Sequence, residues 1–183
     1  MGEQRGGAGV GGAALPVKVP VVGGGPAGGT AMLFCSHPFS WSSSNTGLAI
    51  RRHGGDSFAL HTHVMIERGA TWDVACTRVT DRLAVPCEGR FASLPPLSLY
   101  FYDGAECLRA FDENPAAARR PRGFSCEELG GLAWGWDANF PGIQRLSVDF
   151  PLFVSPHGTG CSRYVSTLAT GGGIMASWQQ SQP

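Results

Sequence analysis

The chain has 183 residues, which is enough for one domain with a single hydrophobic core. Its formal net charge is zero and 15% of its residues are charged, against about 25% in a typical soluble domain. The sequence therefore has no basic field for nucleic-acid binding and no acidic tail, and no stretch approaches the ~20 apolar residues of a membrane-spanning helix.

The first 30 residues contain few side chains that could form a core, and glycine is frequent among them. We interpret residues 1–30 as a flexible Gly-rich N-terminal arm, with one short strand expected near 17–22, and residues 31–183 as a single domain. The 27 glycines and 13 prolines of the chain favour many turns and short strands over long helices.

From Thr30 onward, ten segments have the length and composition of β-strands. They are rich in Val, Ile, Phe, Tyr, Trp and Leu, and most are bounded by turn residues. The segments are 30–35, 46–52, 57–67, 71–79, 97–103, 107–111, 132–136, 144–154, 163–169 and 173–178. In Leu146–Phe150, apolar and polar residues alternate, which predicts that the apolar side chains share the buried face of a half-buried strand.

Helical character is confined to residues 113–129, where Pro115 and Pro121 keep any helix short. Many short strands separated by turn signals predict an all-β fold, an antiparallel β-sandwich or jelly roll. The six cysteines are widely spaced and form no CxxC pair, so we expect reduced and mostly buried thiols.

One glycine motif suggests a cofactor. Gly23, Gly25 and Gly28 match GxGxxG after a strand-like stretch and resemble the dinucleotide fingerprint of flavin-dependent oxidoreductases, which would imply an FAD-binding oxidoreductase fragment. That motif requires a helix after the glycines, and Pro38 with the serines behind it interrupts the stretch where the helix would lie. In a chain this rich in glycine, such a match also arises by chance.

A second motif suggests a metal site. His61 and His63 alternate on a predicted strand, and Glu67 shares their parity, so the three side chains would point to one side. This spacing resembles the first metal motif of cupins, which are jelly-roll metal-dependent enzymes or sensors. The second cupin motif, which supplies a third histidine, is absent from the sequence.

One segment of the sequence offers a candidate nucleophile. Cys161 and Ser162 follow a Gly-rich turn, and His157 lies nearby in the sequence. A catalytic nucleophile also needs an orienting acid and an oxyanion hole, and nothing in the sequence identifies them. We therefore interpret this segment as a turn between strands.

Segments over residues 97–178 resemble, in order and spacing, the later strands of picornavirus-like (rhinovirus-type) capsid proteins. The matching features are a central strand, a Pro-containing loop, a short helical segment, a tryptophan strand, a Pro-x-x-Ser strand and a last strand after a Gly-Gly turn. In this sequence they are Cys107–Phe111, Asn114–Pro121, Ser125–Leu129, Leu132–Asp137, Ser147–Pro156 with Ser162–Ser166 after it, and Gly171–Trp178. The chain is short for a full subunit of this kind, so the resemblance leads us to expect an incomplete domain.

The resemblance implies a structural subunit of an icosahedral virion shell, not an enzyme, without cofactor or metal. Its partners would be other capsid subunits and a host receptor, with non-specific viral RNA contact through the N-terminal arm. It would be found in the virion, and in the host cytoplasm before assembly. The residues expected to build the barrel and its contacts are Trp134, Trp136, Phe150, Pro151, Phe153, Ser155, Pro156, Ile174 and Trp178.

Overall fold

The computed structural model describes residues 21–36, 44–106, 128–158 and 160–181. Over these residues the protein is all-β, with ten strands and three single-turn 3-10 helices. The strands are β1 Val21–Gly24, β2 Thr30–Ser36, β3 Asn45–Arg51, β4 Ala59–Ile66, β5 Cys76–Ala84, β6 Leu97–Ala105, β7 Leu129–Trp136, β8 Gln144–Arg145, β9 Ser162–Thr170 and β10 Gly173–Gln180. The short helices are η1 Pro26–Gly28, η2 Gly89–Phe91 and η3 Asp137–Asn139.

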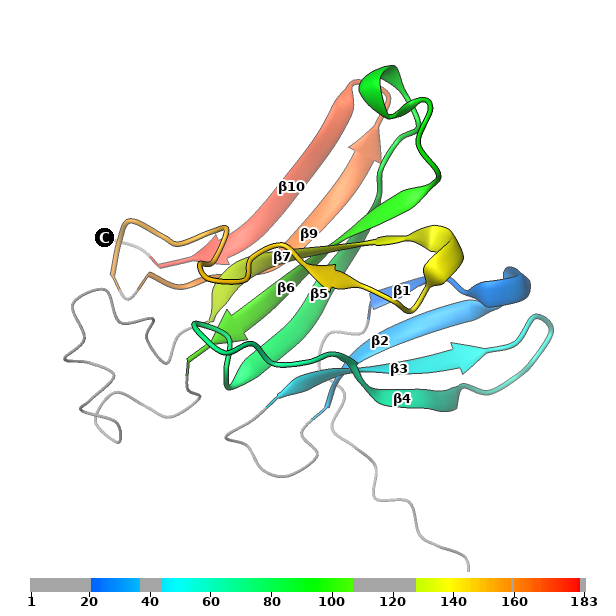
Figure 1. Ribbon diagram of the computed structural model, residues 1–183, viewed down its shortest axis with the longest axis horizontal. Helices are drawn as coiled ribbons and strands as arrows, with labels where there is room; N and C mark the ends of the chain where they lie inside the picture. Colours follow the sequence, from blue (N-terminus) through cyan, green and yellow to red (C-terminus); the bar gives the residue numbers. More distant parts are fainter. Residues whose placement is uncertain (1–20, 37–43, 107–127, 159, 182–183) are drawn as a thin grey trace, which may run out of the picture.

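The strands form three antiparallel sheets (Figure 1). Sheet A has the order β1-β2-β3-β4, sheet B has the order β5-β6-β7-β8, and β9 with β10 forms a separate two-stranded hairpin. The prediction of an all-β antiparallel fold is therefore confirmed. Neighbouring strands in each sheet are consecutive in the sequence, and a jelly roll would add the longer Greek-key connections; the jelly roll stays a prediction.

The core lies between sheets A and B. Alternate residues of β6 point into it, among them Tyr100 and Tyr102, each 1% exposed. The Tyr102 ring stacks on Trp72 with 5.5 Å between ring centroids. Leu33 and Leu48 close the core from sheet A. The alternation of β6 therefore places Tyr100 and Tyr102 inside and leaves its other face, with Phe101, toward the hairpin side.

The two sheets are joined at one corner through buried polar groups. Thr46 Oγ1 donates to the carbonyl of Thr77 and accepts from the backbone N–H of Val79, both at 2.8 Å. Ser44 and Cys76 form an isolated parallel bridge beside them. Strand β3 of sheet A and strand β5 of sheet B are thus held together by hydrogen bonds as well as by the core.

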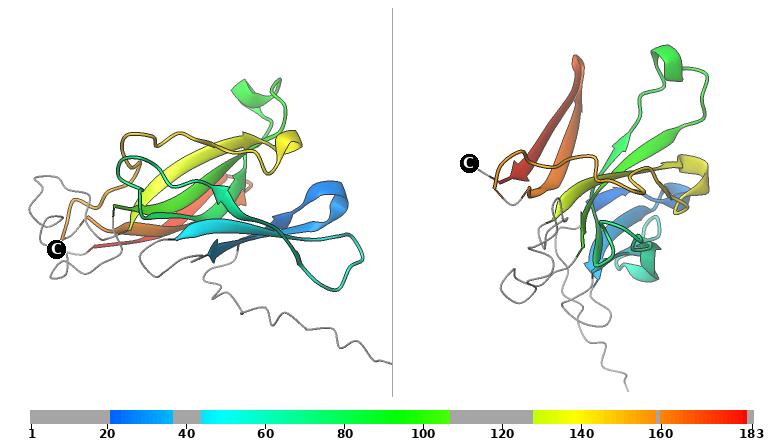
Figure 2. Two further views of the ribbon diagram at one scale, coloured as in Figure 1. Left: turned by 60° about the horizontal axis from the view of Figure 1, so that its bottom comes forward. Right: turned by 60° about the vertical axis from the view of Figure 1, so that its left-hand side comes forward.

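The hairpin packs by one strand against the outer face of sheet B, where β9 lies across β5, β6 and β7. Figure 2 shows that the hairpin and the β5–β6 pair diverge toward their turns. Residues 166–180 are accordingly exposed, apart from the half-buried Thr167. The base of the hairpin is therefore attached and its tip stands apart.

Several predicted segments take a different form. Residues 21–24 were assigned to the flexible arm but form β1, while residues 1–20 lie outside the described residues. Residues 71–75 precede β5 as turns and bends, and only 144–145 of the predicted strand 144–154 is a strand. The predicted strand 107–111, the loop 114–121 and residues 125–127 of the helical segment fall outside the described ranges.

Candidate functional site

The most unusual surface feature follows β8. Five apolar side chains of the segment 146–154 are 50% to 73% exposed. We call this row the apolar ridge; it comprises Leu146, Val148, Phe150, Leu152 and Val154. The prediction that the apolar side chains of Leu146–Phe150 share a buried face is therefore wrong: the polar residue Ser147, 8% exposed, is buried instead.

Hydrogen bonds of Ser147 explain this inversion. Its Oγ accepts from the backbone N–H of Leu132 at 3.0 Å, and its carbonyl accepts from Trp72 Nε1 at 3.0 Å and Tyr102 Oη at 3.3 Å. Six residues on, Phe153 exchanges backbone hydrogen bonds with Gly130 of β7 at 3.0 and 3.2 Å. These bonds hold Ser147 and Phe153 against sheet B, and the even-numbered apolar residues beside and between them are left exposed.

The hairpin carries a second group of exposed apolar side chains. Trp178 of β10, 48% exposed, stacks on Phe153 with 6.2 Å between ring centroids, and Phe153 stacks on Phe101 of β6 at 6.3 Å. Leu168, Ile174 and Met175 on the hairpin are also exposed. One aromatic stack thus connects sheet B, the segment that carries the ridge, and β10.

A buried ionic network fixes the base of the hairpin. Arg78 of β5 pairs with Asp103 of β6 at 2.8 Å and with Glu128, and Glu128 pairs with Arg163 of β9 at 2.9 Å. Arg78 and Arg163 also lie over the ring of Tyr164, 4.9 and 4.8 Å from its centroid. The network contains two cations and two carboxylates, so its formal charge is balanced.

Two carboxylates cap the backbone of β9 on the side away from β10. Asp103 Oδ1 accepts from the N–H of Tyr164 at 3.0 Å, and Asp81 Oδ2 accepts from both the N–H and the hydroxyl of Thr167. Tyr164 has a φ of 56°, which is uncommon for a residue with a side chain. Side chains of sheet B therefore close this edge of the hairpin, where a further strand would otherwise pair.

Burial shifts the protonation of this network. Desolvation raises the pKa of Asp103 to about 6, although Arg78 counteracts the shift. Burial opposes the charge of Arg78, but Glu128 and Asp103 together raise its pKa above the usual value. Burial also raises the pKa of the Cys76 thiol, whose Sγ contacts the carbonyl of Asp103.

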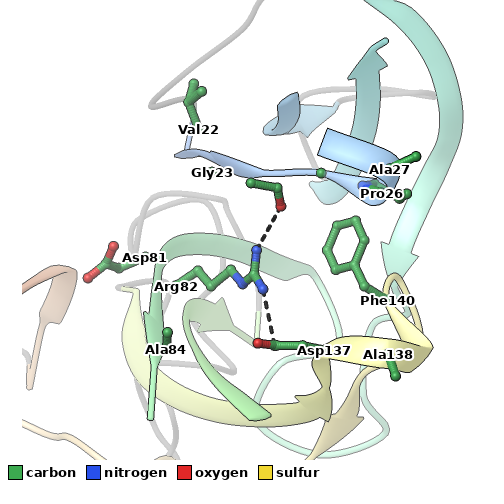
Figure 3. A pocket seen from close by; sticks show the side chains of 12 residues that line it. Val22, Gly23, Pro26, Ala27, Asp81, Arg82, Ala84, Asp137, Ala138 and Phe140 are labelled. Atoms are coloured by element: carbon green, nitrogen blue, oxygen red, sulfur yellow. Dashed lines mark hydrogen bonds and ion pairs between the residues drawn. The ribbon is translucent and has the colours of Figure 1, made fainter. Parts of the chain in front are cut away.

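A second charged group binds the two sheets at a surface cleft of about 750 Å³ (Figure 3). Arg82 of β5 donates to the carbonyl of Gly24 at 3.0 Å, to Ser98 Oγ at 3.1 Å and to Asp137 at 3.1 Å. The Phe140 ring lies 5.5 Å from its guanidinium carbon. All three guanidinium nitrogens of Arg82 thus form hydrogen bonds within the protein, and Arg82 joins sheet A to sheet B at this cleft.

Two of the GxGxxG glycines, Gly23 and Gly25, border this cleft, and the motif forms a hairpin turn. Gly23 belongs to β1, Gly25 donates its N–H to the carbonyl of Gly29 at 2.9 Å, and Gly28 has a φ of 74°. The chain returns directly into β2, through the three-residue helix η1. A dinucleotide fingerprint needs a strand followed by a long helix whose N-terminus meets the pyrophosphate, and these residues do not build one.

The predicted metal residues lie on and just beyond β4. His61 is exposed on the strand, His63 is on the same strand with its side chain outside the description, and Glu67 is exposed after the strand ends. The carbonyl of Glu67 accepts a hydrogen bond from Arg145. Among the described residues, no three His, Cys, Asp or Glu side chains gather in a group that could hold a metal ion.

The candidate nucleophile lies where the chain enters β9. Cys161 is buried just before β9 and donates its backbone N–H to Ser181 Oγ at 3.0 Å, and Ser162 is the first residue of β9. His157 is exposed, and its N–H donates to Ser155 Oγ. Hydrogen bonds of these residues therefore attach the base of the hairpin.

The remaining residues of the predicted structural set fall into three groups. Trp134 and Trp136 are half-buried on β7 and pack edge to face at 5.1 Å. Ser155 is 5% exposed, and its Oγ donates to the carbonyl of Ser181 at 3.1 Å. The others lie on or beside the apolar surface: Phe150 and Ile174 are exposed, Pro151 is half-buried and Pro156 is exposed.

Comparison with protein-family models, with curated proteins and with solved structures found no match. None of the helices in the described part of the chain is long and apolar enough to cross a membrane.

Sequence reasoning missed the ionic network. Arg78 and Asp103 each lie inside an apolar strand segment, and a charge flanked by apolar strand residues was the available signal. Glu128 and Arg163 lie far apart in the sequence, so their pairing emerges only when β9 crosses sheet B. Side-chain spacing along one strand cannot reveal a contact made between sheets.

Proposed function

We propose that the protein is a non-enzymatic structural subunit that packs laterally against other subunits of a shell, as the picornavirus-like resemblance implies. The observation that carries the proposal is the distribution of exposed apolar side chains. Of the fifteen large apolar side chains that are exposed in the described residues, nine belong to residues 146–178. They lie on the apolar ridge and on the hairpin, which the Phe153–Trp178 stack joins.

The chemistry of this surface is that of an interface core. Interface cores are enriched in apolar and aromatic residues and depleted of charge, and large exposed apolar patches in soluble proteins mark contact sites. Within the ridge segment, residues 146–154, Asp149 is the one charged residue. Burying a single Leu, Val or Phe side chain contributes about 1.5–3 kcal/mol, so five in a row offer a substantial driving force.

In this proposal the finer architecture is that of a jelly-roll capsid subunit with an N-terminal arm inside the shell. The all-β fold, the apolar surface and the order of segments between 97 and 178 support it. The expected partners are other capsid subunits, a host receptor and viral RNA contacted through the arm. The expected location is the virion, preceded by the host cytoplasm.

Sedimentation velocity over a range of protein concentrations tests the proposal with a matched pair of variants. Val148→Asp places a charge on the apolar ridge, whereas Val22→Asp places the same charge on β1 at similar exposure, 55% and 59% in the two native residues. We expect the wild type and Val22→Asp to form larger species as concentration rises, and Val148→Asp to stay small. A wild type that sediments as a monomer at every concentration would refute the proposal.

A further inference from the structure

We infer that β10 pairs edge to edge, antiparallel, with β10 of a second copy of this chain. The inference rests on the proposed function, since it names one of the contacts through which subunits assemble. It follows because the backbone groups at one edge of the hairpin are hydrogen-bonded to side chains, and those at the other edge face no described strand. The edge formed by β9 is closed by Asp81 and Asp103, whereas β10 pairs with β9 alone among the described strands.

The register shows which backbone groups of β10 point to the open edge. Thr167 donates its N–H to Asp81 and not to β10, so Thr167 and its partner Ala176 form a non-hydrogen-bonded pair. Ala176 therefore directs its N–H and C=O away from β9, and so does Ile174, two residues back, opposite Ala169. The pairing is regular from Gly173 to Ser177, so these groups form an uninterrupted row.

The composition of β10 leaves this row unprotected. Natural edge strands usually carry charged residues, proline or bulges that prevent further pairing. The segment Gly173–Gln180 contains no charged residue and no proline, and its one register irregularity lies at the end, between Ser177 and Gln179. By contrast β4, the long edge strand of sheet A, carries His61 and His63, and its register shifts twice against β3.

A second copy of the same strand fits this edge better than a charged partner would. Two uncharged strands related by a two-fold axis meet without electrostatic repulsion and make the same contacts from both sides. The product would be a four-stranded sheet in the order β9-β10-β10-β9. A two-stranded hairpin is only marginally stable on its own. A four-stranded sheet with apolar side chains on both faces is more stable. Leu168 and Met175 lie opposite one another on one face, and Ile174 lies on the other.

The test uses two substitutions at the open edge with one control. Ala176→Pro removes the outward N–H without removing a bond to β9, and Ala176→Lys adds the charge that edge strands usually carry. Ala169→Pro is the control. Ala169 of β9 lies opposite Ile174, and its N–H also points away from the partner strand. Circular dichroism confirms that each variant is folded.

We expect wild type and Ala169→Pro to assemble alike in sedimentation velocity, and both Ala176 variants to assemble at least about tenfold more weakly. In the wild type, hydrogen exchange of the amides of Ile174 and Ala176 should slow as protein concentration rises. Such slowing supports the pairing even if a variant fails to fold.

The outcomes separate this inference from the proposed function. If the Ala176 variants assemble like the wild type while Val148→Asp does not, the β10 pairing is refuted and the shell proposal stands. If the Ala176 variants are weakened and Val148→Asp is not, β10 forms a simple dimer and the ridge proposal fails. A wild type that stays monomeric, with concentration-independent exchange in β10, refutes both.

Discussion

Single glycines in sheet B determine how closely the aromatic core can pack. At Gly131 of β7, an added Cβ would lie 2.7 Å from Trp72 Cη2 and also against the ring of Tyr102. Neither ring can move away easily, because Tyr102 Oη bonds Asp73 at 3.1 Å and Trp72 Nε1 bonds the carbonyl of Ser147. The rings thus occupy the space that only glycine leaves at position 131.

Gly131→Ala is therefore expected to lower the free energy of unfolding by about 1–3 kcal/mol, the usual effect of overpacking a core. The matched control is Gly172→Ala in the β9–β10 turn, where an added Cβ meets nothing within 4 Å. Urea unfolding followed by tryptophan fluorescence measures both. Equal stability of the two variants would show that the Trp72 and Tyr102 rings can shift at no cost.

At the scale of elements, strand composition predicted most of the described strands. Segments such as 97–103 and 163–169 coincide with β6 and β9, because β-branched and aromatic residues between turn signals form strands wherever they find a partner. The segment after β8 was interpreted incorrectly. Pattern alone does not show whether the chain turns back at Pro26 or whether Ser147 finds buried hydrogen-bond partners.

The attachment of the hairpin also escaped prediction, for a physical reason. An apolar strand that packs by its side chains leaves a periodic pattern, whereas β9 is held through its backbone by Asp81 and Asp103. A carboxylate that accepts from a distant backbone N–H has no signature in the local sequence. Charged residues inside predicted strands are therefore the positions where sequence periodicity is least informative.

The docking of β9 makes stability depend on pH through Asp103. Burial raises its pKa in the folded protein from 3.8 to about 6, so the folded state binds a proton more tightly than the unfolded chain. This contribution to stability is fully present below 3.8 and is lost as pH rises through about 6. Asp73 shifts in the same direction, so a comparison with Asp103→Asn is needed to isolate the effect.

Relative to Asp103→Asn, which cannot titrate, the wild type should lose stability between about pH 4 and pH 7, on the order of 3 kcal/mol in total. Urea unfolding of both proteins across this range measures the difference, in which the remaining carboxylates largely cancel. A difference that stays constant, or that grows with pH, would show that Asp103 is ionised in the folded protein throughout.

At the scale of the whole molecule, the surface has two distinct parts. The cleft at Arg82 presents backbone turns and paired charges, whereas the ridge and the hairpin carry nine of the fifteen exposed large apolar side chains of the described residues and an open strand edge. The buried charges lie between these parts, where they fix the hairpin base to sheet B. The ionic network thus joins the hairpin to sheet B, while the ridge segment carries one charged residue, Asp149, and β10 carries none.

This division predicts how assembly responds to salt. The net charge is zero, so repulsion between subunits is small, and raising sodium chloride should change the association constant little. Sodium sulfate, which strengthens apolar burial because it is excluded from protein surfaces, should shift the wild type toward larger species. Sedimentation velocity in the two salts at matched ionic strength measures the contrast, with Val148→Asp as the protein that should respond least. Dissociation of the assemblies by sodium chloride would mean instead that ion pairs hold the subunits together, and the apolar ridge would lose its assigned role.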